Sequence, residues 1–189
     1  MRPHAPSRLQ TQRLRTIMPM RQVILITTGG TIEKTYDEQS GTLDNRRSIV
    51  RRMLRRLRLE DTAVSTIELL SKDSLDMTDD DRARVLETVA AQAGRKPPAG
   101  IVILHGTDTL AQTGQLLYTG LQHLTVPVIL TGAMRPYEMT RSDALQNLTE
   151  ALLAASILPA GVYCVGHGRA LAFPGVHKDR VRGTFVRGE

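Results

Sequence analysis

The sequence predicts an α/β fold of three layers, in which a mostly parallel sheet of the flavodoxin-like or Rossmann-like kind carries helices on both faces. Short apolar runs rich in Val, Ile and Leu are typical of strands buried on both sides, and they alternate with segments whose apolar residues recur at helical spacing. Several of these runs stop at glycine and hydroxyl residues. That pattern indicates strands whose carboxyl ends face a ligand crevice.

Length and composition exclude several classes of protein. A chain of 189 residues suffices for one well-cored domain, and no apolar run approaches the ~20 residues of a membrane helix. The only cysteine, Cys164, excludes an intrachain disulfide, and CxxC or HExxH metal-ligand spacings are absent. We therefore expect a soluble, cytoplasmic protein with no membrane partner and no metal.

The net charge of +6 is concentrated near the amino terminus. Five arginines and no acid occur in the first 21 residues, which leaves only about +1 for the remainder. We expect residues 1–20 to form a disordered, dispensable basic arm and residues 21–189 to form a single domain. Since aromatic content is only 3%, we expect no nucleic-acid partner, with a nucleic-acid-binding arm as the alternative.

The first predicted strand, Val23–Ile26, leads into the polar segment Thr27-Thr28-Gly29-Gly30-Thr31. Adjacent glycines allow a sharp turn and let a ligand approach the main chain. The alternative is a glycine turn whose threonines bond the local backbone. Residues 31–43 are polar and include Gly41, so we predict a lid over the site.

The middle of the chain alternates between predicted helices and strands. Apolar spacing predicts a helix over residues 49–57 whose arginines face solvent, followed by a strand over Thr62–Leu70 and a loop over Ser71–Met77. Thr78 is the predicted N-cap of a helix that begins with three aspartates, because carboxylates stabilise a helix amino terminus. That helix ends at Gly94.

Two later strands repeat the opening arrangement. Gly100–Leu104 delivers His105-Gly106-Thr107-Asp108-Thr109, and Val126–Leu130 opens onto Thr131-Gly132-Ala133-Met134-Arg135-Pro136. Directly after a buried run, His105 is predicted to be a packed or orienting histidine. The remaining predicted elements are helices over Leu110–Leu121 and Ser142–Ala155 and short strands over Gly161–Val165 and Ala170–Phe173.

A parallel sheet brings its strand ends to one edge, so these polar segments predict one pocket. The pocket would contain threonine hydroxyls, the carboxylate of Asp108, backbone amides and, from further along, Lys178. Neither GxGxxG nor GxxxxGK[ST] occurs, which argues against dinucleotide or triphosphate binding.

The two threonine segments resemble the signature motifs of the bacterial-type L-asparaginase family. Three further stretches support the resemblance, which spans about residues 22–180: Asp73-Ser74-Leu75-Asp76-Met77-Thr78, Gly132-Ala133-Met134-Arg135-Pro136, and the segment of Lys178. The resemblance implies the amino-terminal domain fold of the longer enzymes, in a short, single-domain form. It also implies hydrolysis of L-asparagine to L-aspartate and ammonia through an acyl-enzyme, without a cofactor.

Site residues follow from the same resemblance. Thr31 is the implied nucleophile with Tyr36 beside it, and the second catalytic set comprises Thr107, Asp108 and Lys178. A threonine hydroxyl needs an adjacent base to attack. By resemblance, substrate contacts come from three residues: Ser74 to the carboxylate, Asp108 to the α-ammonium, and the Ala133 carbonyl to the leaving nitrogen.

Two departures from the family pattern affect these expectations. Leu75 stands where longer members place glutamine, so we expect looser substrate binding. Longer members also carry a second domain that completes a neighbouring subunit's site, and we expect a homo-oligomer. The alternatives are an amidase subunit that passes ammonia to a partner and a non-catalytic module that binds asparagine or aspartate.

Overall fold

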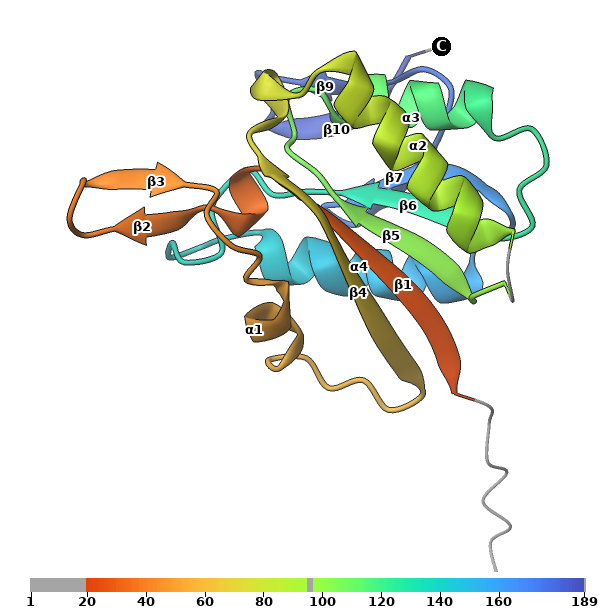
Figure 1. The fold of residues 1–189 in the computed structure, drawn as a ribbon, viewed down its shortest axis with the longest axis horizontal. Helices are drawn as coiled ribbons and strands as arrows, with labels where there is room; N and C mark the ends of the chain where they lie inside the picture. The colour runs from red at the N-terminus through yellow and green to blue at the C-terminus, as the bar shows by residue number, and fades with distance from the viewer. Residues whose placement is uncertain (1–19, 95–96, 189) are drawn as a thin grey trace, which may run out of the picture.

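The computed structural model describes residues 20–94 and 97–188 (Figure 1). Residues 1–19 of the predicted arm lie outside this range, so its disorder and the domain boundary at residue 21 stay predictions. In the described ranges, no helix is long and apolar enough to cross a membrane.

A six-stranded sheet in the order β4-β1-β5-β6-β7-β8 forms the centre of the fold. Its strands, in chain order, are β1 (Arg21–Gly29), β4 (Thr62–Lys72), β5 (Gly100–Leu104), β6 (Pro127–Thr131), β7 (Gly161–Gly166) and β8 (Arg169–Ala172). The first five are parallel, and β8 runs antiparallel to β7. Their order is that of flavodoxin-like folds, which confirms the predicted fold class.

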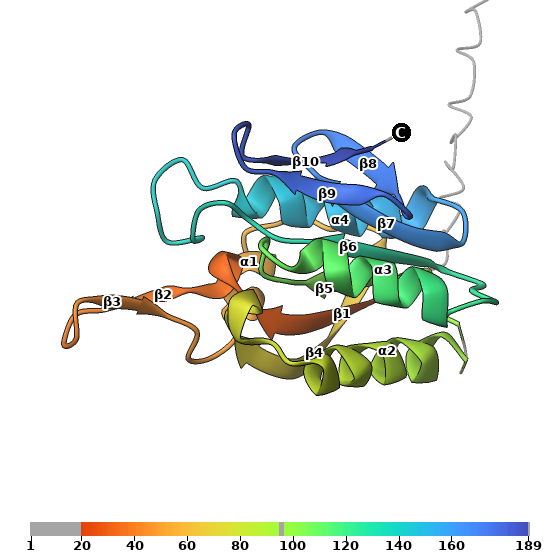
Figure 2. The same cartoon turned by 90° about the horizontal axis from the view of Figure 1, so that it is seen from above.

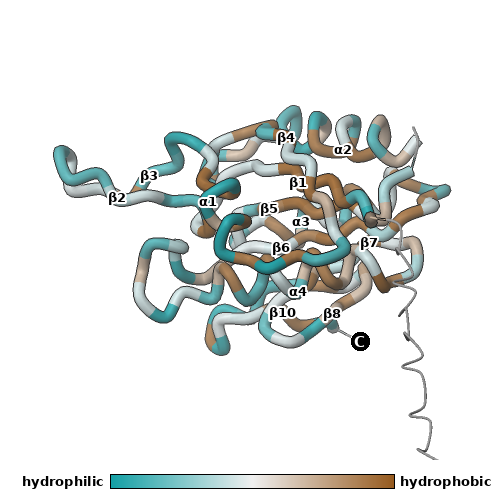
Figure 3. The backbone as a smooth tube through the Cα atoms, turned by 90° about the horizontal axis from the view of Figure 1, so that it is seen from below, coloured by the Kyte–Doolittle hydropathy of each residue, from teal (hydrophilic) through white to brown (hydrophobic). Residues whose placement is uncertain are grey.

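Helices cover both faces of the sheet (Figures 1 and 2). On one face, α2 (Asp79–Ala93) and α3 (Leu110–Gly120) contribute to one buried apolar cluster; on the other, α1 (Val50–Leu54) and α4 (Ala144–Ile157) contribute to a second. The hydrophobic stretches of the chain accordingly run along the interior strands, whereas the projecting segments are paler or hydrophilic (Figure 3). The predicted three-layer arrangement is therefore present.

Strand β5 shows how the sequence produces two cores. Val102 and Leu104 belong to the cluster on one face, whereas Ile101 and Ile103 belong to the cluster on the other. Side chains alternate across a strand, so a continuous apolar run is needed where both faces are covered. All five residues of β5 are buried.

The N-cap predicted at Thr78 is present as a complete capping box. The hydroxyl of Thr78 accepts a hydrogen bond from the Asp81 backbone nitrogen at 3.2 Å, and the Asp81 carboxylate accepts one from the Thr78 nitrogen at 3.0 Å. Lys72 donates to the same carboxylate at 2.7 Å. These hydrogen bonds, from Lys72 first, lower the pKa of Asp81 to about 2.

Two hairpins were not predicted as such. The predicted lid contains a short 3-10 turn, η1 (Thr31–Glu33), and an antiparallel hairpin of β2 (Thr35–Asp37) and β3 (Thr42–Asp44), which projects from the body (Figure 1). Near the carboxyl terminus, β9 (Val176–Asp179) pairs with β10 (Thr184–Arg187).

The predicted helix over residues 49–57 is shorter than expected. It spans only Val50–Leu54, of which Val50 and Met53 are buried. Beyond it the backbone continues in turns, in which the nitrogens of Arg56 and Leu57 donate to the carbonyls three residues earlier. The helix predicted over residues 142–155 begins and ends two residues later, at Ala144 and Ile157.

Candidate active site

The carboxyl ends of β1, β5 and β6 lie side by side, because these strands are hydrogen-bonded neighbours in the sheet. The hydroxyl of Thr28 donates to the carbonyl of Leu104 at 2.9 Å and so joins the end of β1 to the end of β5. From β6, the Thr131 carbonyl accepts from the backbone nitrogen of His105 at 2.8 Å. The three polar segments therefore meet at one edge, as the sequence predicts.

Glycines allow these segments to touch through their backbones. A Cβ on Gly30 would stand 2.3 Å from the Cα of Gly106, and one on Gly106 would stand 2.5 Å from the Ser74 side chain. A Cβ on Gly132 would meet the His105 carbonyl oxygen at 2.3 Å. Contacts this short exclude any side chain at these positions, so the glycines set the spacing of the site.

Lys178 reaches the second threonine segment from β9. Its ammonium nitrogen donates to the hydroxyl oxygen of Thr107 at 2.8 Å and to Oδ1 of Asp108 at 3.0 Å. Thr107 is buried, and the side chains of Lys178 and Asp108 are only 17% and 25% exposed. The structure thus brings together the three residues of the predicted second catalytic set.

Thr31 begins η1, directly after the glycine that lies against Gly106. Its side chain is half-buried, and within residues 20–94 and 97–188 no side chain is hydrogen-bonded to its hydroxyl. The backbone contact between Gly30 and Gly106 places Thr31 at the same edge as the Thr107 set. Its hydroxyl is therefore available to a ligand there.

Tyr36 lies apart from this group. Its side chain is 57% exposed on β2, and its hydroxyl stands 4.0 Å from where a Cβ on Gly41 would be. The backbone nitrogen of Tyr36 donates to the Glu138 carboxylate at 3.0 Å, and Arg52 donates to the same group at 2.6 Å. The hairpin is thus anchored through Glu138, and within the described residues the Tyr36 side chain makes no hydrogen bond to Thr31, beside which the resemblance places it.

Ser74 lies in η2 (Ser74–Asp76), pressed against Gly106. The residue is 1% exposed, and its hydroxyl oxygen has no hydrogen-bond partner within the described part of the chain. The Thr109 hydroxyl donates to its carbonyl at 2.8 Å and fixes the turn. Leu75, in contrast, is 67% exposed and offers only apolar surface.

A polar network that the sequence did not indicate holds the segment around Ala133. The Asp143 carboxylate accepts from the backbone nitrogens of Met134 at 2.9 Å and Arg135 at 3.0 Å, while the Asn147 amide donates to the Gly132 carbonyl at 2.9 Å. Burial acts to raise the pKa of Asp143, but hydrogen bonds from Met134 and from His167 bring it below its usual value. Ala133 itself is 1% exposed.

His105 is packed, as predicted. It is fully buried, and burial lowers its pKa to about 4. The Gly106 carbonyl, 2.8 Å from Nδ1, can only accept, so Nδ1 carries the proton and Nε2 accepts from the Thr113 hydroxyl at 2.9 Å. This neutral ring orients the loop that carries Thr107.

Glu33 is also buried and ionisable, and unlike His105 it was not singled out from the sequence. It is 2% exposed, and burial raises its pKa to about 7. One carboxyl oxygen accepts from the Gly29 backbone nitrogen at 3.2 Å, and the other is hydrogen-bonded to Ser48. No sequence signal marks it, since a glutamate in a polar stretch is usually exposed.

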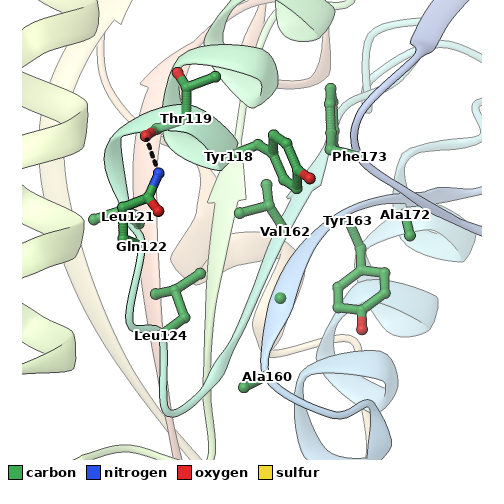
Figure 4. Close-up of a pocket in the computed structure, with 11 residues that line it drawn as sticks. Tyr118, Thr119, Leu121, Gln122, Leu124, Ala160, Val162, Tyr163, Ala172 and Phe173 are labelled. Carbon is green, nitrogen blue, oxygen red and sulfur yellow. Dashed lines mark hydrogen bonds between the residues drawn. The ribbon is translucent and has the colours of Figure 1, made fainter.

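Two cavities of similar volume lie at opposite edges of the sheet. One of about 570 Å³ borders Lys34, Asp73 and Leu75, beside the Ser74 turn. Another, of about 510 Å³, lies at the opposite edge between α3 and β7, where Tyr118, Tyr163 and Phe173 line it (Figure 4). Neither cavity is lined by a predicted site residue, but the first borders Asp73 and Leu75, the two neighbours of Ser74 in the chain, so we place the candidate site at the first edge. Within the described ranges, no group of three His, Cys, Asp or Glu residues could hold a metal ion.

Comparison with known proteins places these features in context. Residues 22–183 match the family model described as "Asparaginase, N-terminal". The chain is 35% identical to L-asparaginase 1 of Escherichia coli strain K12, over 75% of this chain and 42% of that protein. It is 32% identical to a glutamyl-tRNA(Gln) amidotransferase subunit of Aeropyrum pernix, over 97% of this chain and 45% of that protein.

Solved structures agree with the sequence matches. The thermostable L-asparaginase from Thermococcus kodakarensis superposes with a TM-score of 0.78 at 28% identity, over 88% of this chain and 51% of that one. L-asparaginase I from Vibrio cholerae superposes with a TM-score of 0.75 at 27% identity, again over 88% of this chain and 51% of that one. The chain therefore spans about half the length of the relatives that it matches.

Proposed function

The chain belongs to the asparaginase family, and from that premise we propose that it hydrolyses L-asparagine to L-aspartate and ammonia through an acyl-enzyme on Thr31. The observation that carries the proposal is the contact of Lys178 with both Thr107 and Asp108, at the edge where Thr31 lies. These are the residues that the family resemblance assigns to the reaction.

In the first step, the Thr31 hydroxyl oxygen bonds to the side-chain amide carbon and the carbon–nitrogen bond breaks. Nitrogen leaves as ammonia, carrying the proton that the attacking hydroxyl gives up. Because Lys178 donates to the Thr107 oxygen, the Thr107 proton is free to point toward the substrate and take part in this transfer. The Thr107 backbone nitrogen would stabilise the oxyanion, by about 3 kcal/mol if it behaves like other oxyanion-hole donors.

In the second step, a water oxygen bonds to the acyl carbon, the ester to Thr31 breaks and the hydroxyl regains its proton. The Ser74 hydroxyl, buried without a partner in the described part of the chain, is proposed to bind the substrate carboxylate. The Ala133 carbonyl is proposed to accept from the leaving nitrogen. We propose that Tyr36 acts after closure of the β2–β3 hairpin, which would bring it from its exposed position toward Thr31.

A second candidate function is supported by the match to the amidotransferase component over 97% of this chain. In this reading the chain releases ammonia to a partner enzyme. A third candidate, a binding module without turnover, would make no use of the Lys178–Thr107 contact. Cytoplasmic location, a cofactor-free site and homo-oligomeric assembly, with no nucleic-acid or membrane partner, stay predictions of the sequence.

Ammonia release separates these candidates. The purified chain alone is assayed with asparagine, glutamine and a panel of other amides, and Thr31→Ala serves as the matched control. Release from asparagine by the wild-type chain and its loss in the variant would support the proposal. Binding of asparagine without release would indicate a binding module, and release that requires an added partner would indicate an amidotransferase component.

A further inference from the structure

One carboxylate in the candidate site, that of Asp108, forms salt bridges with two cationic side chains. Oδ1 of Asp108 lies 3.0 Å from the Lys178 ammonium nitrogen and 3.1 Å from Nη1 of Arg180. Arg180 is the first residue of the turn that follows β9, two residues beyond Lys178, and its side chain reaches the same oxygen of Asp108. The side chain of Arg180 is 71% exposed, whereas that of Lys178 is 17% exposed.

This arrangement makes the immediate surroundings of Asp108 electropositive. Two positive groups share a single negative one, so the cluster of Asp108, Lys178 and Arg180 has a net charge of +1. Near the Ser74 turn, the ammonium nitrogen of Lys34 lies 2.7 Å from a carboxylate oxygen of Asp73, so the charges of these two side chains cancel. Leu75 adds no charge and no hydrogen-bond acceptor for an ammonium group.

A substrate's two charged groups respond to this cluster in opposite ways. An α-ammonium must approach a carboxylate that two cations already occupy, which reduces its attraction. A carboxylate is attracted by the net charge, and an exposed guanidinium can bind it through two parallel hydrogen bonds. Arg180 is the cation with solvent-facing donors.

We propose that Arg180 is a specificity residue that binds the substrate carboxylate together with the Ser74 hydroxyl, so that this site also accepts carboxamides that lack an α-amino group. This rests on the proposed hydrolysis of asparagine. The substrate class is the monoamides of short dicarboxylic acids, for which succinamate is the probe. Succinamate has the same carbon skeleton as asparagine, so its amide carbon stands at the same distance from the anchored carboxylate.

The reaction is the same acyl transfer. The Thr31 oxygen bonds to the amide carbon, ammonia leaves, and water then cleaves the ester. Succinamate and water therefore give succinate and ammonia, with no oxidant or reductant. The α-amino group takes no part in bond making, so its absence alters only binding and orientation.

Steady-state kinetics on asparagine and succinamate test the proposal in three proteins: the wild-type chain, Arg180→Gln and Arg182→Gln. Arg182 is the matched control, because it is an exposed arginine on the same turn that bonds Asp179 only through its backbone nitrogen. We expect wild-type kcat/KM values for the two amides within about tenfold of each other. Arg180→Gln should lose about ten- to a hundredfold on succinamate, the effect of one charged hydrogen bond. The loss on asparagine should be much smaller, because removal of one cation from Asp108 strengthens the attraction of its carboxylate for the α-ammonium. Arg182→Gln should leave the ratio unchanged.

The outcomes separate this inference from the proposed function. Turnover of asparagine with succinamate a thousandfold slower, or an equal effect of Arg180→Gln on both amides, would overturn the inference alone. If a folded wild-type chain hydrolysed neither amide, the proposed function would fail, and the inference with it.

Discussion

The ammonium nitrogen of Lys178 lies 2.8 Å from the hydroxyl oxygen of Thr107, 71 residues earlier in the chain. The two groups reach each other from different elements, β9 and the loop after β5. A contact this specific between two partly enclosed polar groups is expected where a hydroxyl must exchange a proton. It leads to the first prediction.

Thr107→Val and Lys178→Met each remove one side of the contact while preserving side-chain bulk. We expect each to lower kcat by a factor on the order of 10³, and the double variant to be little worse than either, because groups that act as a unit are not additive. Kinetics of the three variants, with circular dichroism as the folding control, give the answer. Losses that multiply in the double variant would show that the two residues act independently.

Thr31→Ala should abolish turnover while leaving the fold nearly intact. The lost hydroxyl is half-buried and has no hydrogen bond to a described side chain, so we expect the free energy of unfolding to change by less than about 1 kcal/mol. Mass spectrometry of acid-quenched reactions should detect an acyl adduct on the wild-type chain and none on the variant. An adduct that persists in Thr31→Ala would move the nucleophile elsewhere.

Tyr36→Phe tests whether the hairpin closes. Because the ring is 57% exposed, loss of its hydroxyl should not change the thermal midpoint, yet we expect kcat to fall about ten- to a hundredfold if the residue reaches the substrate. Tyr118→Phe is the matched control, since this tyrosine is 43% exposed at the opposite edge of the sheet. Equal activity of both variants would remove Tyr36 from the mechanism.

Glu33→Gln should change how stability depends on pH. Burial raises the pKa of Glu33 from 4.5 to about 7, so the folded state favours the protonated carboxyl. The contribution of the protonated Glu33 carboxyl to the free energy of unfolding is fully present below about pH 4.5 and is lost as pH rises through about 7. This loss amounts to at most about 3 kcal/mol in the wild type. Glu33→Gln should not show it, because glutamine does not ionise.

Urea unfolding of the wild type and Glu33→Gln at pH 5 and pH 8.5 measures this difference. We expect the free energy of unfolding of the variant, compared with that of the wild type, to be higher at pH 8.5 than at pH 5. Parallel pH profiles for the two proteins would mean that Glu33 ionises as freely when folded as when unfolded.

Asp143→Ala should loosen the segment that carries Ala133. Its carboxylate accepts from the backbone nitrogens of Met134 and Arg135, and removal leaves both without their acceptor. We expect a loss of about 2–4 kcal/mol in unfolding free energy together with a lower kcat. Asp143→Asn keeps one acceptor oxygen and should retain more of both. If the alanine variant were as stable as the wild type, the segment around Ala133 would not depend on the Asp143 carboxylate for its stability.

Much of this architecture was predictable from local pattern. The buried run of β5 and the polar segment after it are contiguous in sequence, and parallel pairing then brings such segments together whatever their separation. The capping box at Thr78 is equally local, since its partner is three residues away. No strand-end pattern marks Lys178, and its catalytic role is implied by the family resemblance alone.

The rest depends on contacts that no local signal encodes. Asp143 meets His167 across 24 residues, and Glu33 meets Ser48 across 15. Neither pair has a spacing tied to a helix or a strand, so only the folded chain identifies them. The salt bridge from Arg180 to Asp108 is of the same kind.

The contact between Gly30 and Gly106 also bears on the order of events during folding. Its two halves come from strands far apart in the chain, and a long loop must close before they can meet. Helices α2 and α3, whose internal hydrogen bonds join residues close in sequence, can form earlier. Recovery of enzymatic turnover during refolding should therefore lag behind recovery of the far-ultraviolet helical signal, and its rate would report the docking of β5 against β1.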